Sequence, residues 1–188
     1  LYLPCLLLTF FVRDGFLGHY WLQLMTVCHY VLAGVSMYAL AVSLGLRRLP
    51  SLFAGVAYML SGFMILHAIH QQVITVAAWF PLILLLFRKV LDRSDWLWVC
   101  LAALVLGHST LAGFPQLTLY LYFFLFVYFL YEMLATYRGP ALVSRAALGT
   151  MLRAAAVILL SLGVAAVQLL PTMELSGLSS SRPLPTPR

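Results

Sequence analysis

Long apolar runs separated by short polar breaks make up most of this chain of 188 residues. Several runs reach the roughly 20 residues that a helix needs to cross the hydrocarbon core of a bilayer. Such runs predict membrane-spanning helices, because a helix satisfies its own backbone polar groups in lipid. The apolar runs lie at 1–12, 20–44, 51–91, 96–113, 115–135 and 152–170.

The run 51–91 is too long for one span, since a straight helix over it would be about 60 Å long against a hydrocarbon thickness of about 30 Å. Its strongly polar interior is the segment His67–Gln72, where the backbone can meet water. We therefore expect a hairpin of two helices, 51–69 and 73–91, with Pro81 kinking the second.

Glycine and proline mark the other expected helix ends. Gly45 ends the helix 20–44, Pro115 fits the first turn of the next helix, and Pro171 ends the last span. Residues 176–188 are rich in Ser and Pro and are expected to form a loop or a cut end. Because the chain begins inside an apolar run, we expect an internal fragment of a larger membrane protein.

The fold class predicted by these runs is all-α: one polytopic transmembrane helix bundle over 1–188, with about six to seven spans. Composition agrees, since 64% of residues are apolar and 9% are charged, against roughly 45–50% and about 25% in globular domains. A soluble enzyme, a disordered chain and a nucleic-acid-binding domain are thereby excluded. The widely spaced Cys5, Cys28 and Cys100 are expected to be buried hydrophobic side chains.

The net charge of +6 arises from short basic clusters in alternate loops. The positive-inside rule places these loops in the cytoplasm. The loops holding Asp14, His67–Gln72, Gly113–Gln116 and Thr172–Arg182 then share the outer side. The cytoplasmic set is Arg47, Arg48, Arg88, Lys89, Arg93, Arg138, Arg145 and Arg153, against Arg13, Arg182 and Arg188 outside.

The polar groups predicted to share the outer side are the candidate site residues. His67 and His70 lie three apart on one helix face, and with Gln71 they could bind a phosphate, act as acid or base, or form half of a metal site. The alternative, favoured by the residues alone, is that they are interfacial polar residues closing a hairpin. No further metal ligand is fixed by spacing.

Gly113, Pro115 and Gln116 open a helix whose positive dipole end faces outward, where free N–H groups could hold an anion. The alternative is an ordinary tight turn with a helix-starting proline. Glu174 could orient a sugar hydroxyl or act as a general base, and a solvated loop carboxylate is the plainer interpretation. Asp14 has the same two interpretations.

A second group of polar or small residues is expected to serve helix packing. His29, His108 and Gln168 lie within spans, where polar side chains usually face the bundle interior and find partners. The small residues at 54, 55, 61 and 62 predict a close contact between helices.

An ordered set of short motifs resembles the bacterial YfhO family of multi-pass membrane proteins. One departure is Phe114, where the family usually has a histidine. The motifs are Ala57-Tyr-Met-Leu-Ser-Gly-Phe63, His70, Ala77-Ala-Trp-Phe-Pro-Leu82, Gly113-Phe-Pro-Gln116 and Gln168-Leu-Leu-Pro-Thr-Met-Glu-Leu175.

The family in turn resembles GT-C membrane glycosyltransferases, and this implies a function for the chain. Such enzymes transfer a sugar from a polyprenyl-phosphate carrier to a cell-surface polymer on the outer face of the bacterial cytoplasmic membrane. Their catalytic carboxylate usually lies in the first large outer loop. Leu1–Pro4 resembles the segment after that loop, so the fragment is expected to lack it, and Asp14 does not match its context. A divalent metal cofactor remains open.

Two other functions remain open on the sequence: a transporter or flippase of lipid-linked sugars, and a non-catalytic membrane scaffold. A transporter is expected to show ionisable groups at mid-membrane and repeated halves with broken helices. No acidic residue lies deep in a predicted span and no internal repeat is present. The sequence therefore favours the transferase.

Overall fold

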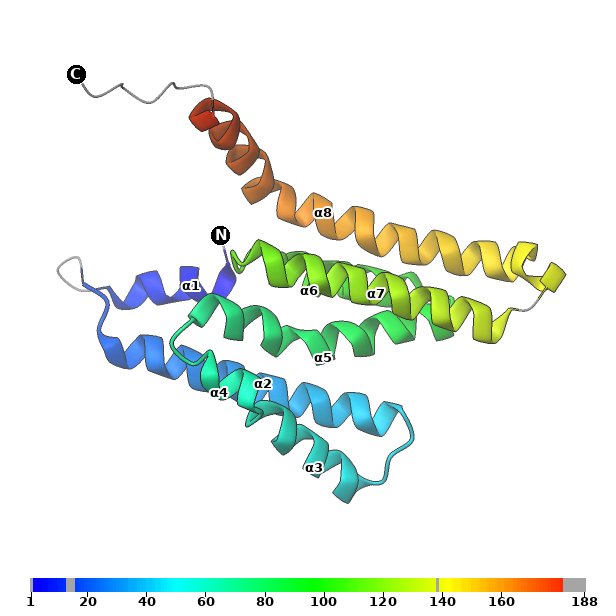
Figure 1. Cartoon of the computed structure of the whole chain (residues 1–188), viewed down its shortest axis with the longest axis horizontal. Helices are drawn as coiled ribbons and strands as arrows, with labels where there is room; N and C mark the ends of the chain where they lie inside the picture. The colour runs from blue at the N-terminus through cyan, green and yellow to red at the C-terminus, as the bar shows by residue number, and fades with distance from the viewer. Residues whose placement is uncertain (1, 13–15, 138, 181–188) are drawn as a thin grey trace.

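The structure is a computed structural model that describes residues 2–12, 16–137 and 139–180 (Figure 1). Every regular element over those residues is a helix, so the predicted all-α class is confirmed. In chain order the elements are α1 (Leu3–Leu8), η1 (Thr9–Phe11), α2 (His19–Ser43), α3 (Arg48–Met59), α4 (Gly62–Leu66), α5 (Gln71–Asp92), α6 (Trp96–Thr110), α7 (Pro115–Thr136), η2 (Gly139–Val143) and α8 (Arg145–Ser180).

Five helical segments of the described chain are long and apolar enough to cross a membrane: His19–Ser43, Arg48–Leu66, Gln71–Asp92, Pro115–Thr136 and Arg145–Gly177. The second combines α3 and α4, and with α5 it forms the hairpin predicted for the long apolar run. The apolar helix α6 has only 15 residues, or about 22 Å at 1.5 Å per residue. The sequence predicted about six to seven spans, and the described residues hold five full-length candidates and this shorter helix.

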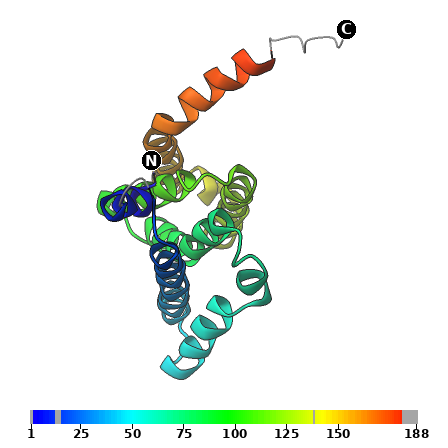
Figure 2. The ribbon, with the colours of Figure 1, turned by 90° about the vertical axis from the view of Figure 1, so that its left-hand side faces the viewer.

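Successive long helices run antiparallel, so their connections collect at two ends of the bundle (Figure 1). The α4–α5 and α6–α7 connections lie at one end, which we call the histidine end. The α2–α3, α5–α6 and α7–α8 connections lie at the other, which we call the basic end. Helix α5 packs against α2, α6, α7 and α8, and the end-on view shows it within the bundle (Figure 2).

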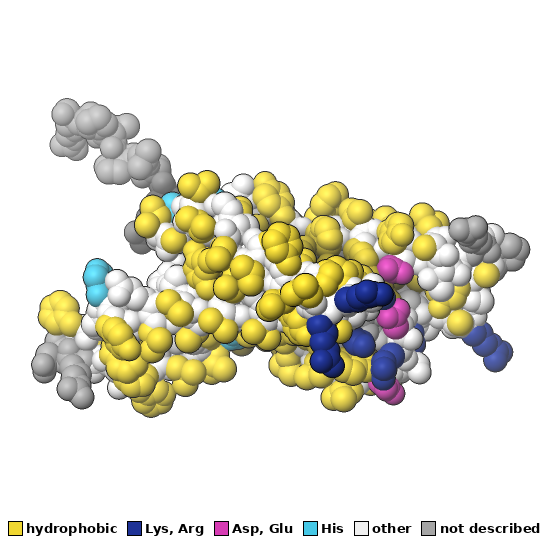
Figure 3. Space-filling view, turned by 90° about the horizontal axis from the view of Figure 1, so that it is seen from below, with side chains coloured by type: hydrophobic (Ala, Val, Ile, Leu, Met, Phe, Trp, Pro, Cys, Tyr) yellow, Lys and Arg dark blue, Asp and Glu magenta, His cyan; other side chains and the backbone are white. Residues whose placement is uncertain are grey.

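The two ends differ in charge as the alternation of basic loops predicts. Lys and Arg side chains gather in the right half of the space-filling view, and histidines lie toward its left end (Figure 3). Between them the surface in this view is largely apolar. The exposed apolar side chains of the long helices include Leu104, Phe123 and Leu159. Apolar surface on this scale suits contact with lipid better than contact with water.

The interior is built around α5. The main apolar cluster joins its C-terminal half to α6, α7 and α8, and a smaller cluster joins its N-terminal half to α2 and α4. Buried side chains at the centre of the main cluster include Val90, Val99, Leu106 and Leu125. This core holds the helix ends that carry the candidate site residues.

Two glycines allow helices to approach closely. A Cβ on Gly55 would lie 2.7 Å from the carbonyl oxygen of Gly34, where α3 crosses α2. A Cβ on Gly107 would lie 2.8 Å from the carbonyl oxygen of Ser161, where α6 crosses α8. The close contact predicted at 55 is therefore confirmed, whereas Gly62 has nothing within 4 Å of its Cβ position.

The predicted helix stop at Pro171 is wrong. Helix α8 continues to Ser180 with Pro171 inside it, and Figure 1 shows a bend along its C-terminal half. A proline removes one backbone hydrogen bond and clashes with the preceding turn, which kinks a helix without having to end it. The loops predicted over 172–182 and 176–188 are therefore helical as far as 180, and the later residues lie outside the described chain.

Two smaller predictions also need correction. Helix α8 begins at Arg145, so Arg153 lies inside a helix, where its Nε donates to the carbonyl oxygen of Val90 (3.3 Å). The cysteines were expected to be buried, but all three are exposed on the surface, where lipid can surround a thiol without penalty.

Candidate functional site

A pocket at the histidine end brings together three of the residues proposed from sequence. His67, His70 and Gln116 line a cavity of about 460 Å³ together with Phe63, Val73, Phe114, Leu117 and Tyr120. The walls come from α4, the start of α5 and the start of α7. The antiparallel path of the chain brings these segments together because it returns α7 to the end where α4 meets α5.

The two histidines follow one another around the α4–α5 connection. His67 is the C-cap of α4, and its Nδ1 donates to the carbonyl oxygen of Phe63 (2.8 Å). A carbonyl only accepts, so Nδ1 carries the proton and Nε2 stays available. His70 is the N-cap of α5 and is exposed, with its ring centroid 6.0 Å from that of His67.

The third wall is the N-terminus of α7. Gly113 has φ of +85°, the left-handed conformation that the turn requires and that a glycine adopts without strain. Phe114 is the N-cap and Pro115 occupies the first turn. Only the Thr118 N–H of that turn is bonded, to the Phe114 carbonyl, and the described residues offer no partner for the N–H groups of Gln116 and Leu117. These are the orphan donors at the positive end of the helix dipole.

The side chains at this N-terminus also offer donors. Gln116 Nε2 donates to the Tyr120 hydroxyl (3.1 Å), which leaves the Tyr120 proton free to donate in turn. No Asp or Glu of the described chain lines the pocket. A group of donors at a positive helix end, with no carboxylate among them, is the chemistry that holds an anion.

The remaining binding candidates do not line the pocket but shape its surroundings. Gln71 turns away from it, and its Nε2 donates to the Leu22 carbonyl and to Thr26 Oγ1, both at 2.9 Å, on α2. Gly113 lies beside Gln168, whose Nε2 would be 3.9 Å from a Cβ built at Gly113. The Oε1 atom of Gln168 is buried and has no hydrogen-bond partner among the described residues.

The two catalytic candidates are not brought to the pocket. Glu174 is exposed on α8 beyond the bend at Pro171 and does not line the cavity. Asp14 lies outside the described residues. The divalent metal left open by the GT-C resemblance finds no ligand set either, because no group of three His, Cys, Asp or Glu side chains in the described chain could hold one.

A buried polar cluster beneath α1 was only partly foreseen. His29 Nδ1 donates to the Met25 carbonyl (2.7 Å), so His29 Nε2 accepts from the Tyr2 hydroxyl (2.7 Å). The Trp79 indole N–H donates to the same hydroxyl (2.7 Å), and the His108 ring stacks on Tyr2 with centroids 4.5 Å apart. Histidines inside spans predicted interior partners, but Tyr2 carries no sequence signal for this role.

The sequence matches no protein-family model, and neither the characterised proteins nor the solved structures compared with it contain a match.

Proposed function

We propose that this chain belongs to a membrane glycosyltransferase-like protein of the YfhO and GT-C type. In this proposal the pocket at the histidine end binds the phosphate of a polyprenyl-phosphate-linked sugar. The observation that supports the proposal is the meeting of His67, His70 and Gln116 with the free N–H groups of α7 in one cavity. The transfer would take place at the outer face of the bacterial cytoplasmic membrane, with a cell-surface polymer as acceptor.

The physical chemistry of the pocket suits a phosphate. The helix N-terminus contributes about 0.3–1 kcal/mol toward an anion, and each hydrogen bond to a charged group about 1.5–3 kcal/mol. Imidazole N–H groups can donate hydrogen bonds to an anion that enters the cavity. Phe63, Val73 and Leu117 form the apolar side of the cavity, where the first isoprene units of a carrier could lie.

The described residues of this pocket supply binding and orientation. Transfer also needs a base to take the proton of the acceptor hydroxyl, and no carboxylate lines the pocket. Glu174 is therefore not assigned that role. A flippase of lipid-linked sugars, or a scaffold that only holds them, would use the same phosphate contacts without breaking the sugar–phosphate bond.

Alanine substitutions test the pocket. In the full-length protein reconstituted into vesicles, His70→Ala and Gln116→Ala should each weaken binding of polyprenyl phosphate about tenfold, which corresponds to about 1.4 kcal/mol. Gln72→Ala is the matched control, because Gln72 is exposed in the same segment but does not line the cavity. Unchanged binding in both pocket variants, with normal expression, would remove these residues from the site.

A second assay separates the three functions. Radiolabelled sugar on the carrier should appear in polymer if the protein is a transferase. It should cross the bilayer while still attached to lipid if the protein is a flippase. It should stay bound and unchanged if the protein is a scaffold.

A further inference from the structure

Two cavities follow one another along the seam between α5, α7 and α8, toward the basic end. The first, of about 480 Å³, is lined by Phe87, Phe129 and Ala154 among others. The second, of about 240 Å³, is lined by Leu91, Met133 and Thr150 among others. On each helix, the residue named for the second cavity lies four positions from the residue named for the first. Four positions are about one helical turn, or about 5.4 Å. The two cavities are therefore neighbouring compartments along one seam between the same three helices.

The first compartment is a groove for hydrocarbon. It forms where aromatic side chains of α7 face small residues of α8, such as Ala155, which do not fill the space between the helices. Among the described residues that line it, the polar side chain is Tyr122, whose hydroxyl is already bonded to Ser161 Oγ (3.0 Å) and Thr110 Oγ1 (3.3 Å). Its outer wall includes the exposed Phe126, so the groove borders the lipid-facing surface.

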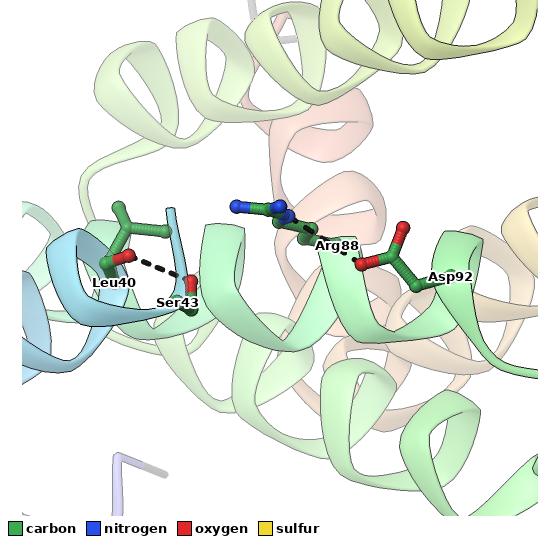
Figure 4. A network of polar contacts seen from close by, with 4 residues as sticks. All are labelled: Leu40, Ser43, Arg88 and Asp92. Atoms are coloured by element: carbon green, nitrogen blue, oxygen red, sulfur yellow. Dashed lines mark hydrogen bonds and ion pairs between the residues drawn. The ribbon is translucent and has the colours of Figure 1, made fainter. Parts of the chain in front are cut away.

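The second compartment is polar, and its two charged lining residues in the described chain are both acidic. These residues are Asp92 and Glu132, and Tyr137 and Thr150 add hydroxyls, which are bonded to each other at 3.2 Å. Guanidinium groups adjoin its wall, since Arg153 donates to Thr150 Oγ1 (3.1 Å). Asp92 has a loose ion pair with Arg88 (3.6 Å), drawn in Figure 4 together with the Ser43–Leu40 hydrogen bond of the neighbouring α2. Lys and Arg side chains gather at this end, with Asp and Glu side chains among them (Figure 3).

We propose that the seam holds a phospholipid with a primary-amine head group. One hydrocarbon chain fills the apolar groove, and the ammonium meets Asp92 and Glu132 in the polar compartment. The phosphate lies among the arginines of the basic end. Charge complementarity selects this lipid, because an anionic head group would meet two carboxylates and a quaternary ammonium could donate no hydrogen bond to them. The site lies at the opposite end from the phosphate pocket and does not depend on the proposed function.

Lipid retention by the whole protein tests the proposal. The purified protein would be incubated with equal amounts of phosphatidylethanolamine, phosphatidylcholine and phosphatidylglycerol, and bound lipid measured by native mass spectrometry. Phosphatidylethanolamine should be retained about tenfold more strongly than the other two. Glu132→Gln should remove that preference while leaving some lipid bound, because it keeps the shape of the side chain and removes its charge.

A variant in the groove tests the binding of the lipid's hydrocarbon chain independently of its head group. Ala155→Phe fills the apolar compartment from an exposed position on α8 and should abolish retention of all three lipids. Ala57→Phe, on the exposed face of α3, is the matched control and should retain lipid like the parent. Equal retention of the three lipids by the parent, or a preference unchanged in Glu132→Gln, would overturn the head-group assignment. Full retention by Ala155→Phe would overturn the groove.

Discussion

The Tyr2 hydroxyl is a single group that connects three helices. It accepts from Trp79 of α5 and donates to His29 of α2, so one oxygen ties the start of α1 to two long helices. Both Tyr2 and His29 are 4% exposed. Buried hydrogen bonds of this kind contribute modestly when made and are costly when one partner is lost.

Tyr2→Phe should therefore destabilise the bundle. The substitution keeps the ring but removes the partner of the buried His29 Nε2, at a cost of about 1–3 kcal/mol, and also the acceptor of the partly buried Trp79 N–H. Thermal unfolding in detergent, followed by tryptophan fluorescence, should show a lower Tm. Tyr131→Phe is the control, since Tyr131 is exposed on α7. Equal Tm values for the two variants would contradict the role of this hydroxyl.

The same residues show what a sequence can and cannot disclose about side chains. Depth inside a span predicted that His29 would find an interior partner, because lipid offers none. The identity of that partner depends on where α1 lies against α2, and Tyr2 is 27 positions away in the chain. Gln71 shows the converse: its polarity suggested a ligand, whereas its amide is used to hold α5 against α2.

Helix packing shows that two glycines in similar helices have different roles. Gly107 lies where α6 crosses α8, with Val164 Cβ 2.7 Å and the Ser161 carbonyl 2.8 Å from the position of a Cβ. Gly163 lies inside α8 with nothing within 4 Å of that position. Gly107 therefore permits two helices to cross closely, whereas no helix of the described chain approaches the Cβ position of Gly163.

Gly107→Ala and Gly163→Ala should consequently shift stability in opposite directions. The first forces α6 and α8 apart and should cost about 1–3 kcal/mol through overpacking. The second gains helix propensity, up to about 1 kcal/mol. The expected changes in Tm are a fall of about 2–4 °C per kcal/mol lost for Gly107→Ala and a small rise for Gly163→Ala. A Gly107→Ala protein as stable as the parent would show that the two helices can separate at no cost.

Helix positions were more predictable than helix ends. The bilayer demands long apolar runs, so α2, α5 and α7 lie close to the residues predicted for them. The end of α8 was missed because Pro171 signals a break without saying whether the chain stops or bends. The shortness of α6 was missed because its apolar run continues into the turn before Gly113.

At the scale of the whole molecule, the alternation of the helices decides which residues can meet. It places the α4–α5 and α6–α7 connections at one end, and this is why His70 and Gln116 share a cavity although 46 positions separate them in the numbering. That juxtaposition could be predicted from the basic loops alone. The seam between α5, α7 and α8 could not be predicted from the sequence, because it depends on where the packed side chains of three helices leave a cavity.

Cysteine labelling tests the arrangement of the ends. In a background without Cys5, Cys28 and Cys100, a membrane-impermeant maleimide applied to intact cells should label Gln72→Cys and Gln116→Cys. It should label Ser94→Cys, in the α5–α6 connection, only after the membrane is permeabilised. Labelling of positions 72 and 116 from opposite sides would contradict the antiparallel path and the pocket that depends on it.

The anchoring of Gln71 to α2 has a mechanical consequence for its neighbour. His70 cannot be drawn inward without straining the two bonds that Gln71 makes with Leu22 and Thr26. We therefore expect a ligand that displaces His70 to act on α2 as well, although α2 contributes no wall to the cavity.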